Sequence, residues 1–208
     1  MSTGLFITLE GGEGAGKTTA LQTIQKWLAA RGRRVIVTRE PGGTAAAERI
    51  RELLLDPATG SLTPMSELLL MFAARQENLT QVIRPALARG DDVVSDRFTD
   101  ASRAYQGAGR ALGEAAVETL AGLVHPGFAP DLTLLLDVPV DVGMARIRGR
   151  DGGPDRMEQS RPDFLERVRQ AYLDRARREP ERFAVIDATR PLEAVTAAIE
   201  DALARRVY

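Results

Sequence analysis

Residues 5–19 read LFITLEGGEGAGKTT, a short apolar run followed by a glycine-rich loop. The spacing Gly11-x4-Gly16-Lys17-Thr18 matches the P-loop pattern, and it lies between a predicted strand and a predicted helix, where that pattern belongs. Glycines allow successive backbone N–H groups to point at one phosphate, and the N-terminus of the following helix adds a favourable dipole. This stretch predicts a site for a nucleoside triphosphate.

The loop also assigns individual roles. Lys17, one of only two lysines in the chain, is expected to reach the β- and γ-phosphates. The Thr18 hydroxyl is expected to ligate Mg²⁺, with Asp96 as a second candidate ligand. The candidate ATP-binding residues are Gly11, Gly12, Glu13, Gly14, Ala15, Gly16, Lys17, Thr18 and Thr19.

Composition limits the class of protein. The chain has 208 residues, an apolar fraction of 44% and no cysteine, which favours one domain spanning residues 1–208 in a reducing compartment. The net charge of -1 argues against a nucleic-acid partner. No apolar run approaches the roughly 20 residues that cross a bilayer, and no secretory signal is visible, so we expect no membrane partner and a cytoplasmic location.

Five continuous apolar runs predict strands that are covered on both faces. Longer segments with helical spacing separate them, which predicts an α/β fold with a five-stranded parallel sheet and helices on both faces. The expected strands are Leu5–Leu9, Val35–Thr38, Asp92–Ser95, Leu132–Asp137 and Phe183–Asp187. The expected helices are Thr18–Ala30, Ala45–Leu55, Met65–Ala88, Glu114–Val124, Val140–Arg148, Arg161–Arg178 and Leu192–Arg206.

The ends of the strands are the expected place for a ligand, since open α/β sheets bind ligands beyond the carboxyl ends of their strands. Two segments between helices have loop composition, Asp56–Thr63 and Gly149–Asp155. The helix that contains SELLLMFAA is apolar over most of its surface, so it is either fully buried or placed at a subunit interface.

A P-loop alone does not name a reaction. A GTPase would need an Asn-Lys-x-Asp motif, but the single asparagine, Asn78, is followed by leucine. A motor ATPase would carry paired acids at a strand end, and neither Asp96 nor Asp137 is followed by a second acid. A transferase needs arginines for a second anionic substrate. Arg39 and Arg97, at two strand ends, supply them.

At this point the sequence resembles the thymidylate kinases, which pass the γ-phosphoryl group of ATP to dTMP. The resemblance follows the P-loop with REPGGT at 39–44, FAAR at 72–75, DRF at 96–98, AYQ at 104–106 and DRMEQ at 155–159, and it extends to residue 195. It implies a P-loop kinase fold, Mg²⁺ with ATP as co-substrate, dTMP as acceptor and a homodimer.

The resemblance also implies roles on the acceptor side. Arg97 would bridge the acceptor phosphate and the transferring group, a task that suits the planar fork of arginine. Arg51 would hold the acceptor phosphate, Arg75 the thymine ring, and Tyr105 the sugar. The candidate dTMP-binding residues are Glu13, Glu40, Arg51, Met71, Phe72, Arg75, Arg97, Tyr105 and Gln106.

Two positions depart from the family pattern, and both concern the base. Met71 stands where the family often has a base-stacking phenylalanine, so either Met71 or Phe72 is expected to contact thymine. Ala101 stands where a small polar residue is common. These departures keep open a kinase of the same fold for another nucleoside monophosphate, with a regulatory P-loop nucleotide binder as a further alternative.

The resemblance places a lid over ATP at about residues 146–158. In the resembled family one subgroup carries its catalytic arginine in the P-loop and another carries it in the lid; the P-loop here has no arginine, so the resemblance implies that the arginine that stabilises the transition state comes from the lid. The candidates are Arg148, Arg150 and Arg156, with the choice among them left open, and Lys17 and Arg97 complete the candidate catalytic set.

Overall fold

A parallel sheet forms the centre of the computed structural model, which describes residues 4–148 and 162–206. Within these ranges the sheet has five strands in the order β2-β3-β1-β4-β5, and all four neighbouring pairs are parallel. This confirms the expected sheet. The strands are β1 (Phe6–Gly11), β2 (Val35–Arg39), β3 (Asp92–Asp96), β4 (Leu132–Asp137) and β5 (Phe183–Asp187).

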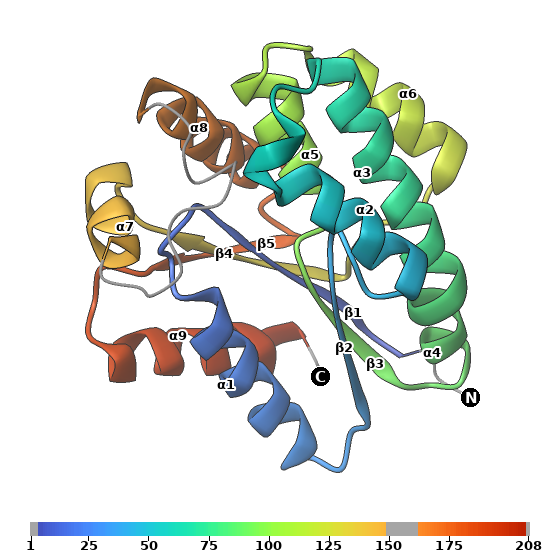
Figure 1. Cartoon of the computed structure of the whole chain (residues 1–208). Helices are drawn as coiled ribbons and strands as arrows, with labels where there is room; N and C mark the ends of the chain where they lie inside the picture. The colour runs from blue at the N-terminus through green and yellow to red at the C-terminus, as the bar shows by residue number, and fades with distance from the viewer. Residues whose placement is uncertain (1–3, 149–161, 207–208) are drawn as a thin grey trace.

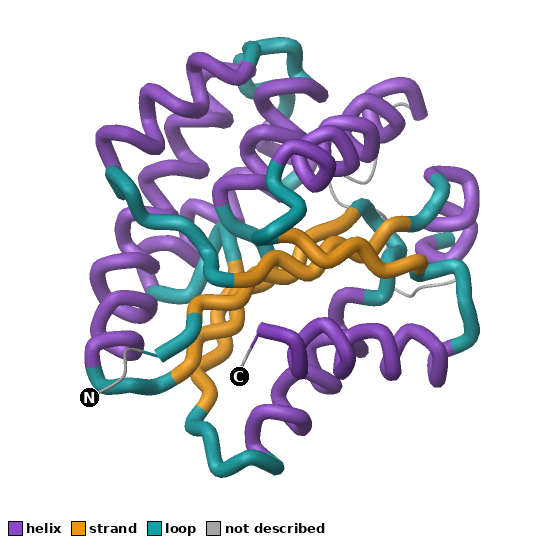
Figure 2. The backbone as a smooth tube through the Cα atoms, turned by 180° about the vertical axis from the view of Figure 1, so that it is seen from behind, coloured by secondary structure: helices purple, strands orange, loops and turns teal. Residues whose placement is uncertain are grey.

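Helices cover both faces of the sheet, as the alternation of strand and helix patterns predicts. Figure 1 shows α1 and α9 on one face and α3, α5, α6 and α8 on the other, and Figure 2 shows the same layers from behind. The helices are α1 (Lys17–Ala29), α2 (Ala45–Leu55), α3 (Pro64–Asn78), α4 (Arg84–Ala88), α5 (Thr99–Ser102), α6 (Glu114–Val124), α7 (Val140–Ile147), α8 (Pro162–Arg178) and α9 (Leu192–Arg206).

The largest apolar cluster lies between the sheet and the pair α1 and α9. Strand residues such as Leu9 and Leu134 pack there against Ile24 and Leu28 of α1 and Leu203 of α9, and all five side chains are fully buried. Burial of large aliphatic side chains contributes about 1.5–3 kcal/mol each. The carboxyl end of β1, which continues into the glycine loop, is therefore held by a rigid base.

Two stretches differ from the sequence-based expectation. The segment Met65–Ala88, expected as one helix, is divided by a π-helical turn at Leu79–Ile83. The segment Thr99–Gly109, which has no expected element, is helical, with a π-helical part η3 (Arg103–Gly109). Its inward-facing residues include polar ones such as Ser102, so it lacks the apolar periodicity on which the expectation depends.

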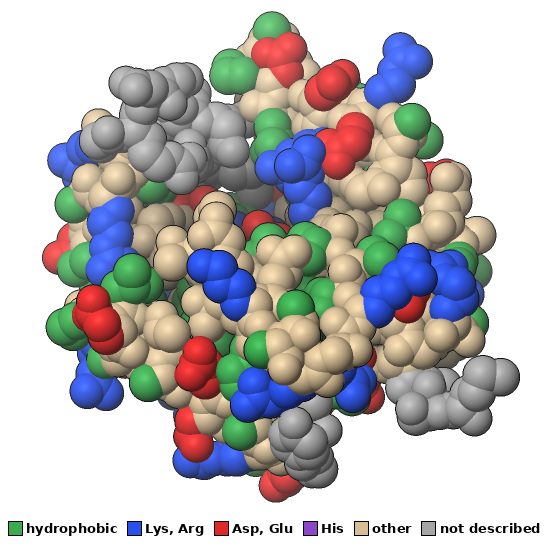
Figure 3. Space-filling model, turned by 90° about the horizontal axis from the view of Figure 1, so that it is seen from below, with side chains coloured by type: hydrophobic (Ala, Val, Ile, Leu, Met, Phe, Trp, Pro, Cys, Tyr) green, Lys and Arg blue, Asp and Glu red, His purple; other side chains and the backbone are tan. Residues whose placement is uncertain are grey.

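The surface carries mixed charge. On the face shown in Figure 3, basic and acidic side chains are interspersed with hydrophobic ones. Within the described ranges, none of the helices combines the length and the apolar character that crossing a membrane requires. Among the large apolar side chains that are exposed are Met65 and Leu69 of α3, at 44% and 51%, and Leu123 of α6, at 79%.

Candidate active site

The glycine loop follows β1 and begins α1, as its sequence predicts. Its backbone is possible only for glycine at Gly14, where φ is 71° and an added Cβ would lie 2.1 Å from the carbonyl oxygen of Gly143. The ammonium of Lys17 donates to the carbonyl oxygens of Gly11 and Gly12 at 3.3 and 3.2 Å. Burial lowers the pKa of Lys17, and the charge of Arg97 adds to this effect.

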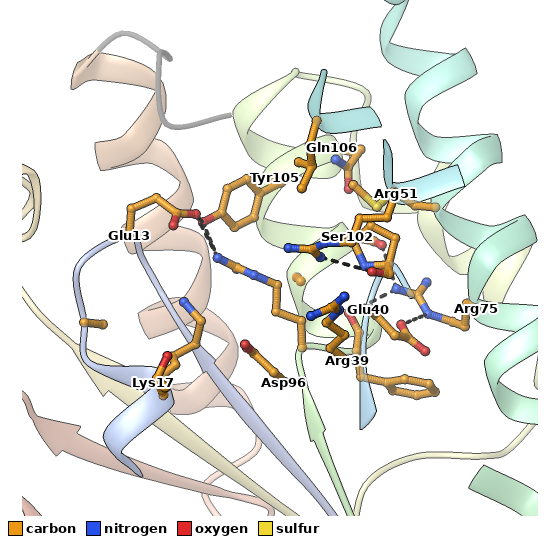
Figure 4. A pocket seen from close by; sticks show the side chains of 18 of the residues that line it. Glu13, Lys17, Arg39, Glu40, Arg51, Arg75, Asp96, Ser102, Tyr105 and Gln106 are labelled. Atoms are coloured by element: carbon orange, nitrogen blue, oxygen red, sulfur yellow. Dashed lines mark hydrogen bonds and ion pairs between the residues drawn. The ribbon is translucent and has the colours of Figure 1, made fainter. Parts of the chain in front are cut away.

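A cavity of about 320 Å³ opens beside this loop, at the carboxyl ends of β1, β2 and β3. Register explains the convergence, because Asp96 at the end of β3 lies opposite both Leu9 of β1 and Arg39 of β2. Figure 4 shows side chains from all three strand ends pointing into the same space. The lining comprises Glu13–Thr18, Arg39–Pro41, Arg51, Leu55, Met71, Arg75, Asp96–Phe98, Ala101, Ser102, Tyr105 and Gln106.

Cationic side chains crowd one part of this cavity. Burial lowers the pKa of Arg51, and the charges of Arg39 and Arg97 lower it further. Arg51 donates to the carbonyl oxygen of Pro41 at 3.0 Å, which holds its side chain over the cavity. Like charges held close together repel each other, and an anion between them relieves the repulsion. The arrangement therefore fits a phosphate group.

Arg97 lies at the centre of a hydrogen-bond network beside the loop. Its Nη2 donates to Glu13 Oε1 at 2.8 Å and to the Tyr105 hydroxyl at 3.1 Å, and its Nη1 donates to the Tyr172 hydroxyl at 3.2 Å. Burial works against the charge, but Tyr105 and Glu13 raise the pKa of Arg97 well above its ordinary value. The guanidinium is a fixed cation between the loop and the acceptor side.

Arg75 forms the opposite end of the cavity and is 2% exposed. Its Nε donates to Glu40 Oε2 at 2.7 Å, and its Nη2 donates to Ser102 Oγ at 3.0 Å and to the carbonyl oxygen of Phe98 at 3.1 Å. Within the described residues its Nη1 is buried without a hydrogen-bond partner. Such a group costs free energy unless a ligand accepts from it, so Nη1 is a donor for a ligand.

Met71 and Phe72 lie in different places. Met71 lines the cavity. Phe72 is 2% exposed and absent from the lining; its ring lies 4.4 Å from the Arg75 guanidinium carbon and stacks on His125 at 6.2 Å. Of the two candidates for contact with a base, the geometry favours Met71, and Phe72 supports Arg75 from behind.

The candidate metal ligands are both oxygen donors at the cavity. Thr18 and Asp96 line it, and Oδ1 of Asp96 is buried without a hydrogen-bond partner among the described residues. No cluster of three or more His, Cys, Asp or Glu side chains suited to a metal ion occurs in the described part of the chain. An ion that completes its shell with phosphate oxygens and water fits this pair, and Mg²⁺ binds in that way.

Three loop positions from the candidate ATP-binding set are outside the cavity lining. Gly11 and Gly12 contribute carbonyl groups to Lys17, as described above, and Thr19 lies in the first turn of α1, where its carbonyl oxygen accepts from the Thr23 hydroxyl at 3.3 Å. Of the candidate ATP-binding set, the residues that line the cavity are Glu13 through Thr18.

Of the three candidate lid arginines, Arg148 is within the described residues. Arg148 follows α7, is exposed, and lines a separate hollow with residues of α7 and α8, such as Asp141 and Glu166. Arg150 and Arg156 lie outside the described residues, as does most of the expected lid at 146–158. Arg146 is described, and it donates to the carbonyl oxygens of Gly14 and Ala188 at 3.2 and 2.9 Å.

Sequence patterns did not indicate every residue of the site. Ser102 belongs to the helical segment without apolar periodicity, and Tyr172 belongs to α8, outside all of the motifs. The Tyr172 hydroxyl donates to Oε2 of Glu10 at 2.7 Å, and burial raises the pKa of Glu10 to about 8. Arg39, by contrast, is expected from the sequence as a strand-end cation for the second substrate; it lines the cavity and pairs with Glu48 at 2.7 Å.

Comparison with known proteins gives a consistent result. The family model described as thymidylate kinase matches residues 9–199. A thymidylate kinase of Chromohalobacter salexigens is 57% identical over 208 residues, covering 100% of this chain and 98% of that protein. One of Alkalilimnicola ehrlichii is 54% identical, covering 100% and 95%. The crystal structure of thymidylate kinase from Ehrlichia chaffeensis superposes with a TM-score of 0.78 at 33% identity, covering 97% and 99%.

Proposed function

Because the chain belongs to the thymidylate kinase family, we propose that it transfers the γ-phosphoryl group of ATP to dTMP, giving dTDP and ADP for dTTP synthesis. No observation favours the alternative acceptor, another nucleoside monophosphate. The chain is a P-loop kinase by fold and by family.

The crowding of cations at one cavity supports this reaction most directly. Lys17, Arg51 and Arg97 approach a common space between the glycine loop and the ends of β2 and β3. A nucleotide switch has one phosphate site and no need for a second. Two phosphate-bearing substrates facing each other account for cations on both sides of the space, since phosphoryl transfer depends mainly on positioning and on stabilised charge.

In this proposal Arg97 is the catalytic residue between the two substrates. Its network with Glu13, Tyr105 and Tyr172 fixes the guanidinium before any substrate binds, and fixed charge needs no rearrangement during the reaction. Lys17 holds the β- and γ-phosphates. Glu13 and Tyr105, hydrogen-bonded to each other at 2.8 Å, flank the sugar of dTMP.

We place the thymine ring at the Arg75 end of the cavity. The free Nη1 of Arg75 donates to a keto oxygen of the ring, and Met71, Gln106 and Glu40 complete the pocket around it. A thioether packs well against an aromatic ring.

Mg²⁺ belongs to the proposal as an ion that enters with ATP. Thr18 and Asp96 would hold it, directly or through water, and when bound it neutralises charge on the β- and γ-phosphates. Arg148, Arg150 and Arg156 remain candidates for the arginine that completes the charge around the γ-phosphate. We propose that residues 146–158 act as the lid and that the whole chain is one kinase domain.

We further propose a cytoplasmic homodimer. The exposed apolar side chains Met65 and Leu69 on α3 and Leu123 on α6 support a dimer, since contact with a second copy would bury them. Size-exclusion chromatography with light scattering tests it, and a Leu69→Glu variant that remains dimeric would argue against this surface.

A coupled assay of ADP release tests the reaction, with dTMP, dUMP, CMP, GMP and AMP compared as acceptors. We expect release that depends on dTMP, and its absence would refute the proposal. Arg97→Ala should abolish turnover while fluorescent ATP-analogue binding persists. Turnover that survives in this variant would contradict the role of Arg97.

A further inference from the structure

Glu67 is a buried acid for which the proposed reaction has no role. It belongs to the first turn of α3, is 0% exposed, and is not among the residues that line the cavity. A buried carboxylate is costly unless it is paired and hydrogen-bonded. The residues that pair with Glu67 should therefore explain why an acid is buried beside the base end of the cavity.

Two partners of Glu67 come from the segment that lines the cavity. Gln106 Nε2 donates to Glu67 Oε1 at 2.9 Å, and the Arg110 guanidinium donates to both carboxylate oxygens at 3.3 Å. Gln106 is 1% exposed and lines the cavity, whereas the Arg110 side chain is 27% exposed and is not part of the cavity lining. The cation of Arg110 keeps a negative charge favourable on Glu67.

This contact fixes the orientation of the Gln106 amide. A carboxylate only accepts hydrogen bonds, so the NH₂ group of Gln106 must face Glu67. Rotation of the amide by half a turn would place its oxygen against a carboxylate oxygen and lose a charge-assisted hydrogen bond. Because the NH₂ group is held by Glu67 and Gln106 lines the cavity, the amide oxygen Oε1 is the group that Gln106 offers to a ligand, as an acceptor.

The base end of the cavity thus offers a defined pair of groups. Arg75 Nη1 is a donor, because a guanidinium cannot accept, and Gln106 Oε1 is an acceptor. A pyrimidine with a 4-keto oxygen and an N3–H matches this pair. A 4-aminopyrimidine presents a donor and an acceptor in the opposite order, so both contacts would be unfavourable.

We propose that Glu67 is a positioning residue that holds Gln106 as a hydrogen-bond acceptor and so selects 4-keto over 4-amino pyrimidine nucleotides. The inference depends on the proposed function, in which this cavity binds a pyrimidine nucleoside monophosphate. This role explains why Glu67 is buried although it does not line the cavity. It attributes the selection of the base to the orientation of the Gln106 amide rather than to the shape of the cavity.

The test compares dTMP with 5-methyl-dCMP, which differ only at the N3 and C4 edge of the ring. In Glu67→Gln the new amide can donate as well as accept, so Gln106 can rotate and offer its NH₂ group to the cytosine N3. We expect the ratio of kcat/KM for dTMP to that for 5-methyl-dCMP to fall at least about 10-fold. The inhibition constant of 5-methyl-dCMP against dTMP should fall in parallel.

Glu77→Gln is the matched control, because Glu77 also belongs to α3, also accepts from a glutamine, Gln81, and does not line the cavity. This control should keep the wild-type ratio. If Glu67→Gln does not fold, Glu67→Asp is the alternative test variant. It retains the negative charge beside Arg110, but its shorter side chain cannot reach Gln106 as well. It should lower the ratio as well.

An unchanged ratio in a folded Glu67 variant, or equal losses for both nucleotides, would overturn the inference. A folding defect alone would move the urea midpoint and leave the ratio unaltered. If the wild-type protein does not phosphorylate dTMP, the proposed function fails, and that result is separate from the behaviour of the variants.

Discussion

Acid should destabilise this protein through its single histidine, His125, which directly follows α6 and is 4% exposed. Its Nδ1 lies 3.1 Å from the carbonyl oxygen of Phe128, which can only accept, so Nδ1 carries the hydrogen. Its Nε2 therefore accepts from the Thr99 hydroxyl at 2.9 Å. Protonation would turn this acceptor into a donor, in a buried place that also feels the charge of Arg75.

The size of the effect follows from the pKa. Burial lowers the pKa of His125 from 6.5 to about 4, with the charge of Arg75 as the next cause. The unfolded chain therefore binds a proton between pH 6.5 and 4 that the folded protein rejects, and the free energy of unfolding falls as the pH falls through this window. One pKa unit corresponds to 1.36 kcal/mol, so the full loss is about 3 kcal/mol.

Urea unfolding at pH values from 7 to 4 measures this loss. The fluorescence of the one tryptophan, Trp27, which is 6% exposed in α1, reports the transition. His125→Asn, which cannot take up a proton, should be less stable at pH 7 but should lose about 3 kcal/mol less than wild type on going to pH 4. Carboxylates titrate equally in both proteins, so equal losses in the two would refute this account of His125.

Three further predictions concern the cavity. Glu40→Gln leaves the guanidinium of Arg75 buried without its counter-charge, so the free energy of unfolding should fall by about 3 kcal/mol; a urea midpoint that gives less than about 1 kcal/mol would contradict this. Arg51→Ala should raise the KM for dTMP at least about 10-fold by removing a charged phosphate contact, with the KM for ATP unchanged, and a parallel rise in both would count against the assignment. Thr18→Ala should raise the Mg²⁺ concentration needed for half-maximal activity, and an unchanged Mg²⁺ titration would exclude Thr18 as a ligand.

The sequence was sufficient for the sheet because its strands are continuous apolar runs between clear breaks. All five expected strands occur, and the first three extend one or two residues further, to Gly11, Arg39 and Asp96. Those extra residues are polar or glycine, so apolar patterning could not include them. They are also the residues that begin the site, because a strand end that faces a ligand no longer needs apolar side chains.

The part that patterning could not predict is the segment Thr99–Gly109. Its inward side is lined with buried polar groups, among them Ser102 and Gln106, that hydrogen-bond to other polar groups across the fold. Apolar periodicity detects helices that bury hydrocarbon, and this helix buries a hydrogen-bond network. The sequence could not decide between Met71 and Phe72 for a related reason. Only the three-dimensional structure shows that Phe72 packs against the Arg75 guanidinium and that Met71 lines the cavity.

The close contact between Gly14 and Gly143 has a consequence for how this protein can change over evolutionary time. An added Cβ on Gly143 would lie 2.3 Å from the carbonyl oxygen of Glu13, just as one on Gly14 would meet Gly143. Arg146, one turn further along α7, also binds the Gly14 carbonyl. Neither glycine can therefore be replaced without moving the other backbone, and compensation by a second nearby substitution is blocked because the obstacle is main chain on both sides. Over evolutionary time, Gly14 in the loop and Gly143 in α7 should therefore be retained together. Their substitutions are coupled even though about 130 residues of chain separate them.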